Sequence, residues 1–411
     1  LYLIAGSLVI LVVLAIAFFF LGAFQIEPQL MSAMRITLII VGFDQAIMFF
    51  FMASTAIGPF HRYDVNNIIG IPTSIISALV IVYFLRQGYG LVSLGIITIV
   101  TTVVRTVIRR IYQQTLVPQI EFHPKYVKKD RSRELLGYGL ISFFIVISWM
   151  VVFNTDNIII GVFLSTTAVT YYSIAGNLVN HLRGLINAIG VPLVPAISHY
   201  EATSDMSQIS NLYAKITRYL FYFTTSVCTL LLIFGDDFIY LWMGPDFTKT
   251  VHILYILVIP SAIYLPQIAA NSVMLGIGKH RPLFYILVSE AALNLVLSLA
   301  LVKPLGIYGV ALGTAVTQLL IYTYLFPYVF HRVIRGDLKS FYGYTLKTVS
   351  ISLIIAVPVG LVVDRFNPLS GWTGLIVGLI ITGLPLIWGF WWGVLYPEDK
   401  TKLKAKLARK G

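Results

Sequence analysis

The sequence predicts an all-α polytopic membrane protein, and three observations lead to this prediction. Of the 411 residues, 58% are hydrophobic and only 11% are charged, and the mean hydropathy is +0.87. A water-soluble domain has about a quarter of its residues charged. Apolar runs of about 20 residues, enough to cross a bilayer core of about 30 Å, recur along the whole chain. These runs lack the alternation of a barrel wall, so we expect helices.

Twelve stretches are long and apolar enough to be transmembrane helices. They are 1–24, 33–57, 65–84, 89–111, 135–155, 168–197, 215–234, 251–275, 283–302, 307–330, 343–363 and 372–395. The first of them contains no charged residue. The segments between them are too short for a folded catalytic domain.

The positions of lysine and arginine predict the orientation. If the C-terminus is cytoplasmic, 21 of the 29 basic residues fall in inner loops or adjoining helix ends, and four fall in outer loops. Inner loops of membrane proteins are enriched in these residues. The distribution also accounts for the net charge of +12, so no nucleic-acid partner is needed. We therefore expect a multi-pass protein of the inner (plasma) membrane with a cytoplasmic C-terminus.

An internal repeat indicates duplication. Ile57–Arg62 resembles Gly276–Arg281, and Tyr89–Gly95 resembles Tyr308–Gly313, both at an offset of 219 residues. Both members of each pair lie on the same predicted membrane side, so the two copies would be parallel, related by an axis along the membrane normal. Because Leu1 would correspond to Leu220, we expect a 14-helix, two-bundle transporter that lacks its first two helices.

The predicted spans and the internal repeat divide the chain into five parts. They are a first helix bundle of four helices (1–112), a basic cytoplasmic linker (113–133), a second six-helix bundle (134–332), a final helix pair (341–396) and a basic cytoplasmic tail (397–411).

Four motifs between residues 134 and 320 carry a resemblance to a known transporter family. They are Asp156-Asn157-Ile158-Ile159-Ile160-Gly161, Thr170-Tyr171-Tyr172-Ser173-Ile174-Ala175-Gly176, Val191-Pro192-Leu193-Val194-Pro195-Ala196-Ile197-Ser198, and Asn294-Leu295 leading through Leu305-Gly306-Ile307-Tyr308-Gly309-Val310-Ala311. Their order, with the expected 14 helices, resembles the polysaccharide flippase branch of the multidrug/oligosaccharidyl-lipid/polysaccharide exporter superfamily.

The resemblance implies an O-antigen-type flippase. Such a transporter moves a polyprenyl-pyrophosphate-linked oligosaccharide from the inner to the outer leaflet, by alternating access, for surface polysaccharide biosynthesis. Its implied partners are that lipid-linked glycan, the lipid bilayer and polysaccharide polymerase machinery. A multidrug or cation exporter, or a peptidoglycan-precursor flippase, of the same fold is the alternative.

A polar stripe in span 168–197 is the candidate wall of a substrate cavity. At 100° per residue, one helical face collects Ser173, Asn177, Asn180, Gly184 and Asn187, with His181 and Arg183 beside it. Asn and His could hydrogen-bond sugar hydroxyls, and Arg183 could pair with pyrophosphate. The alternative is helix–helix adhesion, because Asn and Ser are common at transmembrane interfaces. A cavity dominated by acids would instead favour a cationic drug.

Three intramembrane acids, Asp44, Glu290 and Asp156, are candidates for coupling transport to a proton or sodium gradient. Glu290 could instead be neutral or paired with Arg183, and Asp156 could serve an outer gate or cap a helix. We expect no cofactor, no metal site and no enzyme activity. The sequence has no phosphate-binding loop with its lysine and no zinc-ligand spacing among its seven histidines.

Overall fold

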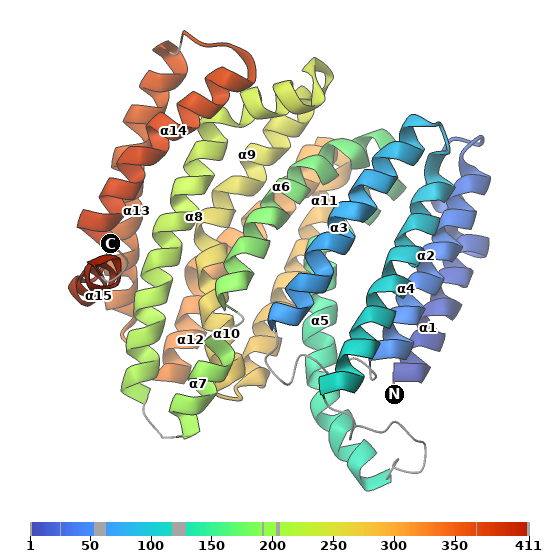
Figure 1. Cartoon of the computed structure of the whole chain (residues 1–411), viewed down its shortest axis with the longest axis horizontal. Coiled ribbons are helices and arrows are strands. Elements are labelled where there is room, and N and C mark those ends of the chain that lie inside the picture. Colours follow the sequence, from blue (N-terminus) through green and yellow to red (C-terminus); the bar gives the residue numbers. More distant parts are fainter. Residues whose placement is uncertain are drawn as a thin grey trace. The chain divides into compact units, whose positions relative to one another are not determined.

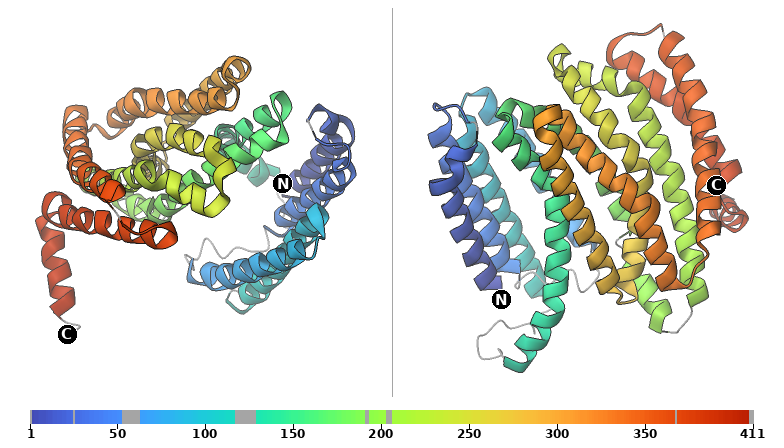
Figure 2. Two further views of the ribbon diagram at one scale, coloured as in Figure 1. Left: turned by 90° about the horizontal axis from the view of Figure 1, so that it is seen from above. Right: turned by 180° about the vertical axis from the view of Figure 1, so that it is seen from behind.

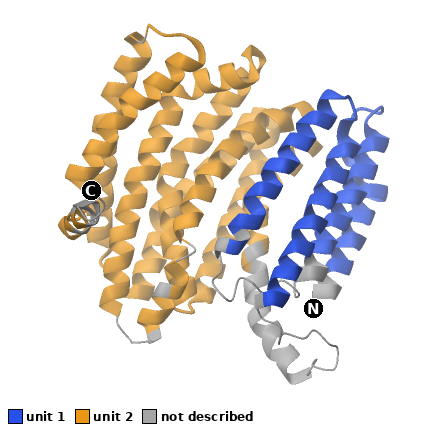
Figure 3. Ribbon diagram, in the orientation of Figure 1, with its two compact units in different colours: residues 1–135 blue, residues 136–411 orange. Residues whose placement is uncertain are grey.

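The computed structural model describes residues 2–24, 26–52, 63–116, 129–190, 193–202, 206–366 and 368–408. Every regular element in these ranges is helical (Figure 1). Two compact units divide the chain, unit 1 over residues 1–135 and unit 2 over 136–411 (Figure 3). Most of the predicted linker, residues 117–128, lies outside the described residues.

Unit 1 is built on four long helices. α2 packs against both α1 and α4, and α3 packs against α4. Their bounds are α1 Tyr2–Ala15, continued by η1 Ile16–Phe20 and η2 Leu21–Ala23, then α2 Met31–Met52, α3 Tyr63–Arg86 and α4 Gly90–Leu116. Only 6% of the most apolar window of α3, Asn67–Arg86, is buried. Exposed apolar helix surface of this kind is what a bilayer solvates.

Unit 2 is organised around α9, which packs against α6, α8 and α11 and lies among them in Figure 1. α13 packs against α8, and α14 packs against α13, so the final helix pair joins the bundle through α8. The helices are α5 Lys129–Phe163, α6 Thr166–Gly190, α7 Leu193–Ala202, α8 Met206–Met243, α9 Thr248–Tyr264, α10 Ile268–Gly276, α11 His280–Leu320, α12 Phe326–Ile334, α13 Leu338–Phe366, α14 Gly371–Gly389 and α15 Pro397–Ala408. The short elements are η5 Pro245–Phe247, η6 Leu265–Gln267, η7 Ile321–Leu325 and η8 Phe390–Val394.

The prediction of an all-helical membrane protein is confirmed. In the described residues, nine helical segments are long and apolar enough to cross a membrane. Twelve predicted spans exceed this number partly because 283–302 and 307–330 both fall in one continuous segment, His280–Ile334. In addition, α6 is not among these nine, and the described side chains of α5 cover only the segment Ile147–Phe163 of its apolar part.

α11 contains a sharp break at Gly306, whose backbone (φ 60°, ψ −138°) is not helical. Tyr308-Gly309 follows this break, and Tyr89-Gly90 closes the turn between α3 and α4. The second motif pair of the repeat therefore marks a junction between consecutive helices in each unit. Ile57–Arg62, in the first pair, lies outside the described residues.

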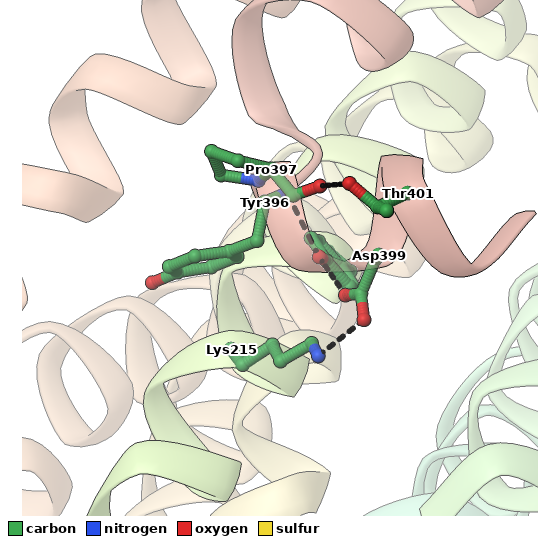
Figure 4. Close-up of polar contacts among 6 residues, drawn as sticks. Lys215, Tyr396, Pro397, Asp399 and Thr401 are labelled. Atoms are coloured by element: carbon green, nitrogen blue, oxygen red, sulfur yellow. Dashed lines mark hydrogen bonds and ion pairs between the residues drawn. The ribbon is translucent and has the colours of Figure 1, made fainter. Parts of the chain in front are cut away.

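The tail helix α15 is fastened to the start of α8. Asp399 accepts a hydrogen bond from Tyr219 at 2.6 Å and forms an ion pair with Lys215 at 2.6 Å (Figure 4). The backbone N–H of Tyr396 donates to the Tyr219 hydroxyl at 3.1 Å. Figure 2 shows α15 turning sharply away from the helix before it. These contacts hold the first turn of the tail against unit 2.

Candidate functional site

The polar stripe lies on the side of α6 that unit 2 leaves uncovered. The opposite side packs into the core of unit 2 through Tyr172, Ala175, Val179, Leu182 and Ile186. Along the stripe, Asn177, Gly184 and Asn187 are exposed, whereas Ser173 and Asn180 are half-buried; the neighbouring His181 is exposed. The described residues of unit 2 therefore leave much of this face exposed.

Arg183 lies at the edge between the two sides of α6 and is half-buried. The central carbon of its guanidinium group sits 3.6 Å from the centre of the Phe153 ring of α5. A cation over an aromatic face is stabilised by the ring quadrupole. Its Nη1 atom is buried and has no hydrogen-bond partner. The stacked guanidinium thus has a buried N–H group that no described residue accepts from.

Glu290 lies close to Arg183 and is only 1% exposed. Its Oε2 accepts a hydrogen bond from the Tyr322 hydroxyl at 2.9 Å, while Oε1 is buried without a partner. The Tyr322 ring packs against that of Tyr264, with centroids 5.6 Å apart. Among the described residues no ion pair joins Glu290 to Arg183, so the pairing considered as an alternative role for Glu290 is not formed here.

Asp156 is the centre of a separate buried polar cluster, which we call the Asp156 cluster. This carboxylate is 3% exposed and accepts hydrogen bonds from the hydroxyls of Tyr172, Thr314 and Ser298, the last at 3.2 Å. Asn294 donates to Thr314 at 2.8 Å, and its own Oδ1 is buried without a hydrogen-bond partner. Asp156 therefore joins α5, α6 and both halves of α11, and it does not cap a helix.

Asp44, the third predicted acid, belongs to unit 1. It is 2% exposed on α2 and accepts a hydrogen bond from the neighbouring Gln45 at 3.2 Å. Its Oδ1 is buried without a partner. It shares no described cluster with Glu290 or Asp156.

Five residues that bond to or stack on Arg183, Glu290 and Asp156 were not predicted as site residues: Phe153, Tyr172, Ser298, Thr314 and Tyr322. Aromatic residues, serine and threonine are ordinary in apolar helices, so no signal in the sequence distinguishes them. Asn294, which belongs to the fourth sequence motif, donates its amide to Thr314 in the Asp156 cluster. Among the described residues, no group of three or more His, Cys, Asp or Glu could hold a metal ion.

Comparisons with known proteins agree with this architecture. Residues 1–252 match a family described as polysaccharide biosynthesis protein. The uncharacterized membrane protein EpsK of Bacillus subtilis is 23% identical over 320 residues, which cover 76% of this chain and 63% of EpsK. The match therefore spans less than two thirds of that relative.

Among solved structures, the lipid II flippase MurJ in an inward closed conformation is similar to this chain. The superposition has a TM-score of 0.70 and 16% sequence identity, and it covers 94% of this chain and 81% of MurJ. At this identity the likeness shows the fold.

Proposed function

The chain belongs to the polysaccharide biosynthesis protein family, and we propose that it moves a polyprenyl-pyrophosphate-linked oligosaccharide across the membrane. Movement from the inner to the outer leaflet would deliver an O-antigen-type glycan for surface polysaccharide assembly. A transporter rather than a catalyst is supported by the family and by the fold shared with the flippase MurJ. The observation that carries the proposal is the uncovered polar face of α6 with Arg183 at its edge.

The chemistry of that face fits a charged glycolipid. A guanidinium stacked on an aromatic ring uses its flat surface for the stack and leaves its in-plane N–H groups to contact phosphate oxygens. Asn177, Asn180 and Asn187 offer amide donors and acceptors, three and seven residues apart, to sugar hydroxyls. Alternating access would expose this face first to one leaflet and then to the other.

A peptidoglycan-precursor flippase is the second candidate, because MurJ, which shares the fold, is a lipid II flippase. Both cargoes carry a polyprenyl diphosphate, so the same arginine would serve either one. An exporter of cationic drugs is disfavoured, because the charged group beside the stripe is Arg183 and a cation would be repelled.

We also propose that the Asp156 cluster binds the ion that drives transport, sodium being favoured over a proton. Asp156, Ser298, Thr314 and Tyr172 bring together a carboxylate and three hydroxyl oxygens, to which Asn294 adds an unpartnered amide oxygen. Hard cations prefer oxygen ligands of these kinds. Because α5, α6 and α11 all contribute, a bound cation would change how these helices pack.

Leaflet exchange in liposomes tests the cargo. We expect wild-type protein to move a fluorescent polyprenyl-diphosphate oligosaccharide, and Arg183→Ala to slow this at least about tenfold, since a charge-assisted hydrogen bond contributes about 1.5–3 kcal/mol. Arg281→Ala, at an exposed arginine, is the matched control and should transport normally. Equal rates for wild type and Arg183→Ala would show that Arg183 does not contribute to transport of this cargo. Movement of lipid II alone would favour the second candidate.

Sodium dependence tests the coupling. Sodium should raise the thermal stability of the wild type in detergent and should drive transport when a gradient is imposed. Asp156→Asn should abolish both effects because it removes the anionic ligand, whereas Asp246→Asn, at an exposed acid, should abolish neither. A response to sodium that persists in Asp156→Asn would place the ion elsewhere, and a response to a pH gradient alone would favour a proton.

A further inference from the structure

A long groove runs between α3 and α4 in unit 1. It encloses about 710 Å³, within the range of about 300–1,000 Å³ of ligand pockets. Its walls are formed mainly by apolar side chains, including Ile76, Val80, Ile96 and Val100. It extends from the turn between the two helices, at Phe84 and Tyr89, to Thr73 and Val104.

Three of the hydroxyl groups in this groove, those of Thr73, Ser93 and Thr101, donate to carbonyl groups of their own helix, and Thr101 also lies 3.2 Å from the Ser77 hydroxyl of α3. Thr101 donates to the carbonyl of Ile97 at 2.7 Å, and Ser93 donates to the carbonyl of Gly90 at 2.7 Å. Hydroxyls bonded to their own helix present mainly their carbon atoms to a ligand. The groove therefore fits a hydrocarbon chain better than a sugar.

Arg105 lies next to one end of the groove, where it follows Val104 and bonds to Thr73, both of which line the groove. Its Nε donates to the Thr73 hydroxyl and its Nη2 to the Ser74 hydroxyl, each at 3.2 Å, so the guanidinium reaches from α4 to α3. Both partners are uncharged. The residue lies eleven positions, roughly 16 Å, before the end of α4 at Leu116. A charge inside a span is costly without a partner and marks a binding site by default.

Arg109 adds a second positive charge one helical turn beyond Arg105. Its Nε atom is buried and has no hydrogen-bond partner. The two guanidinium groups are close enough to repel each other. Two neighbouring cations at the end of an apolar groove are the electrostatic complement of a diphosphate attached to a hydrocarbon chain.

The groove lies on a different side of α3 from the main stripe of exposed apolar residues. At 100° per residue, the groove residues Thr73, Ser77, Val80 and Phe84 lie on the opposite side of α3 from that stripe. The stripe comprises Ile68, Ile71, Ile75, Leu79 and Val82, exposed by 71%, 60%, 56%, 66% and 49%.

The repeat offset of 219 relates the groove to positions of unit 2. It relates Ser77, Val80, Ile97 and Thr101 to Val296, Leu299, Val316 and Leu320, which are all exposed. The counterparts of Val92 and Ile96, Ala311 and Ala315, are buried. The same offset places Tyr324 and Tyr328 where unit 1 has Arg105 and Arg109. The fold therefore does not require two arginines here, and they are a particular feature of unit 1.

We propose that this groove binds the lipid part of the cargo, with the isoprenoid chain between α3 and α4 and the diphosphate on Arg105 and Arg109. This inference rests on the proposed function, because it assigns a second contact to the same lipid-linked substrate. Two phosphates in series match two arginines a turn apart, whereas the single phosphate of an ordinary phospholipid leaves one of them uncompensated.

Photolabelling tests the groove directly. The full chain is placed in nanodiscs of phosphatidylcholine and irradiated with geranylgeranyl diphosphate that carries a diazirine on its chain. We expect labelled peptides from α3 and α4. Ile76→Trp, which fills the groove, and Arg105→Gln should each lower labelling about tenfold. Ile75→Trp is the matched control, because Ile75 and Ile76 are 56% and 59% exposed and only Ile76 lines the groove.

Several outcomes would overturn the inference. Labelling that is equal in wild type and Ile76→Trp would place the chain elsewhere, and competition by phosphatidylglycerol as strong as by unlabelled geranylgeranyl diphosphate would assign the groove to anionic phospholipid. Labelling requires no transport, so the lipid-binding groove and the flippase activity are tested independently. Loss of groove labelling with intact leaflet exchange would refute only the groove, and groove labelling without leaflet exchange would refute only the flippase.

Discussion

At the scale of single residues, unit 2 keeps its buried charges in two groups of different character. Arg183 and Glu290 lie close together and each retains an unpartnered polar atom, as expected of side chains that exchange partners during transport. Asp156 instead accepts three hydroxyl hydrogen bonds, which hold it in place. We proposed above that Arg183 of the first group contacts the diphosphate of the cargo and that the second group binds a small ion.

Gly306 provides a residue-scale prediction about stability. Its backbone angles, φ 60° and ψ −138°, lie in a region that essentially only glycine adopts, and the break in α11 depends on them. We expect Gly306→Ala to lower the free energy of unfolding in detergent by about 1–3 kcal/mol. Gly343→Ala, in the helical part of α13 with open space around it, should be neutral or slightly stabilising. Equal stability of the two variants would contradict this account.

At the scale of elements, the ends of helices in unit 2 are fixed by acids at their first turns. α15 is held through Asp399, and α13 begins after Asp337, which accepts hydrogen bonds from the backbone N–H groups of Lys339 and Ser340 at 3.0 and 3.3 Å. Acidic side chains there satisfy free N–H groups and oppose the positive end of the helix dipole. Asp337 thus caps the first turn of α13, whereas Asp399 docks the first turn of α15 on α8.

Removal of the Asp399 carboxylate charge should release the tail. Asp399→Asn loses the ion pair with Lys215, which is partly exposed and contributes about 1 kcal/mol. Tryptic cleavage within α15 should accordingly accelerate about fivefold, because cleavage follows the population of the undocked helix. Glu398→Gln, at the exposed neighbouring acid, is the control. Unchanged cleavage in Asp399→Asn would show that the ion pair does not hold α15.

Acid should loosen the first turn of α13. Hydrogen bonds from the Ser340 hydroxyl and the Lys339 backbone hold the pKa of Asp337 below its ordinary value. A lowered pKa in the folded state means that the stabilisation is complete above about pH 4, the unfolded value, and is lost as pH falls through the folded pKa. Amide exchange at Lys339 and Ser340 should rise in that range. Asp337→Asn keeps a capping oxygen and should remove this pH dependence; its persistence would contradict the assignment.

At the scale of the whole molecule, the chain is a multi-pass membrane protein in two compact units, with the fold seen in the lipid II flippase MurJ. The distribution of basic residues leads us to propose a cytoplasmic C-terminus. That orientation would place Arg105 and Arg109 toward the inner leaflet, where the proposed cargo would be loaded.

Cysteine labelling can test this orientation. Cys228 is the single cysteine of the sequence, and its thiol is buried, so background labelling should be low. A cysteine introduced at Ser370, between α13 and α14, should react with a membrane-impermeant maleimide in intact cells. A cysteine introduced at Ala405 in α15 should react only after the membrane is opened. The reverse pattern would invert the proposed topology.

The sequence by itself determined the fold class, the apolar stretches and the polar face of α6, because each follows from the order of apolar and polar residues along one helix. The bilayer requires about 20 apolar residues per crossing, and helical geometry converts spacing into a face. For this reason the spacing of Asn177, Asn180 and Asn187 is enough to place them on one side of their helix.

Only the tertiary structure decided which side chains meet. Asp156 bonds to Ser298 and Thr314, which lie 142 and 158 residues away along the chain. Asn294 bonds to Thr314 in the same cluster and not to Glu290. The guanidinium group of Arg183 stacks on the ring of Phe153, an apolar residue that the sequence does not mark as part of a polar site. The groove between α3 and α4 likewise arises from how two helices pack. Contacts between distant segments depend on the path of the whole chain, and residue order along one helix does not contain that path.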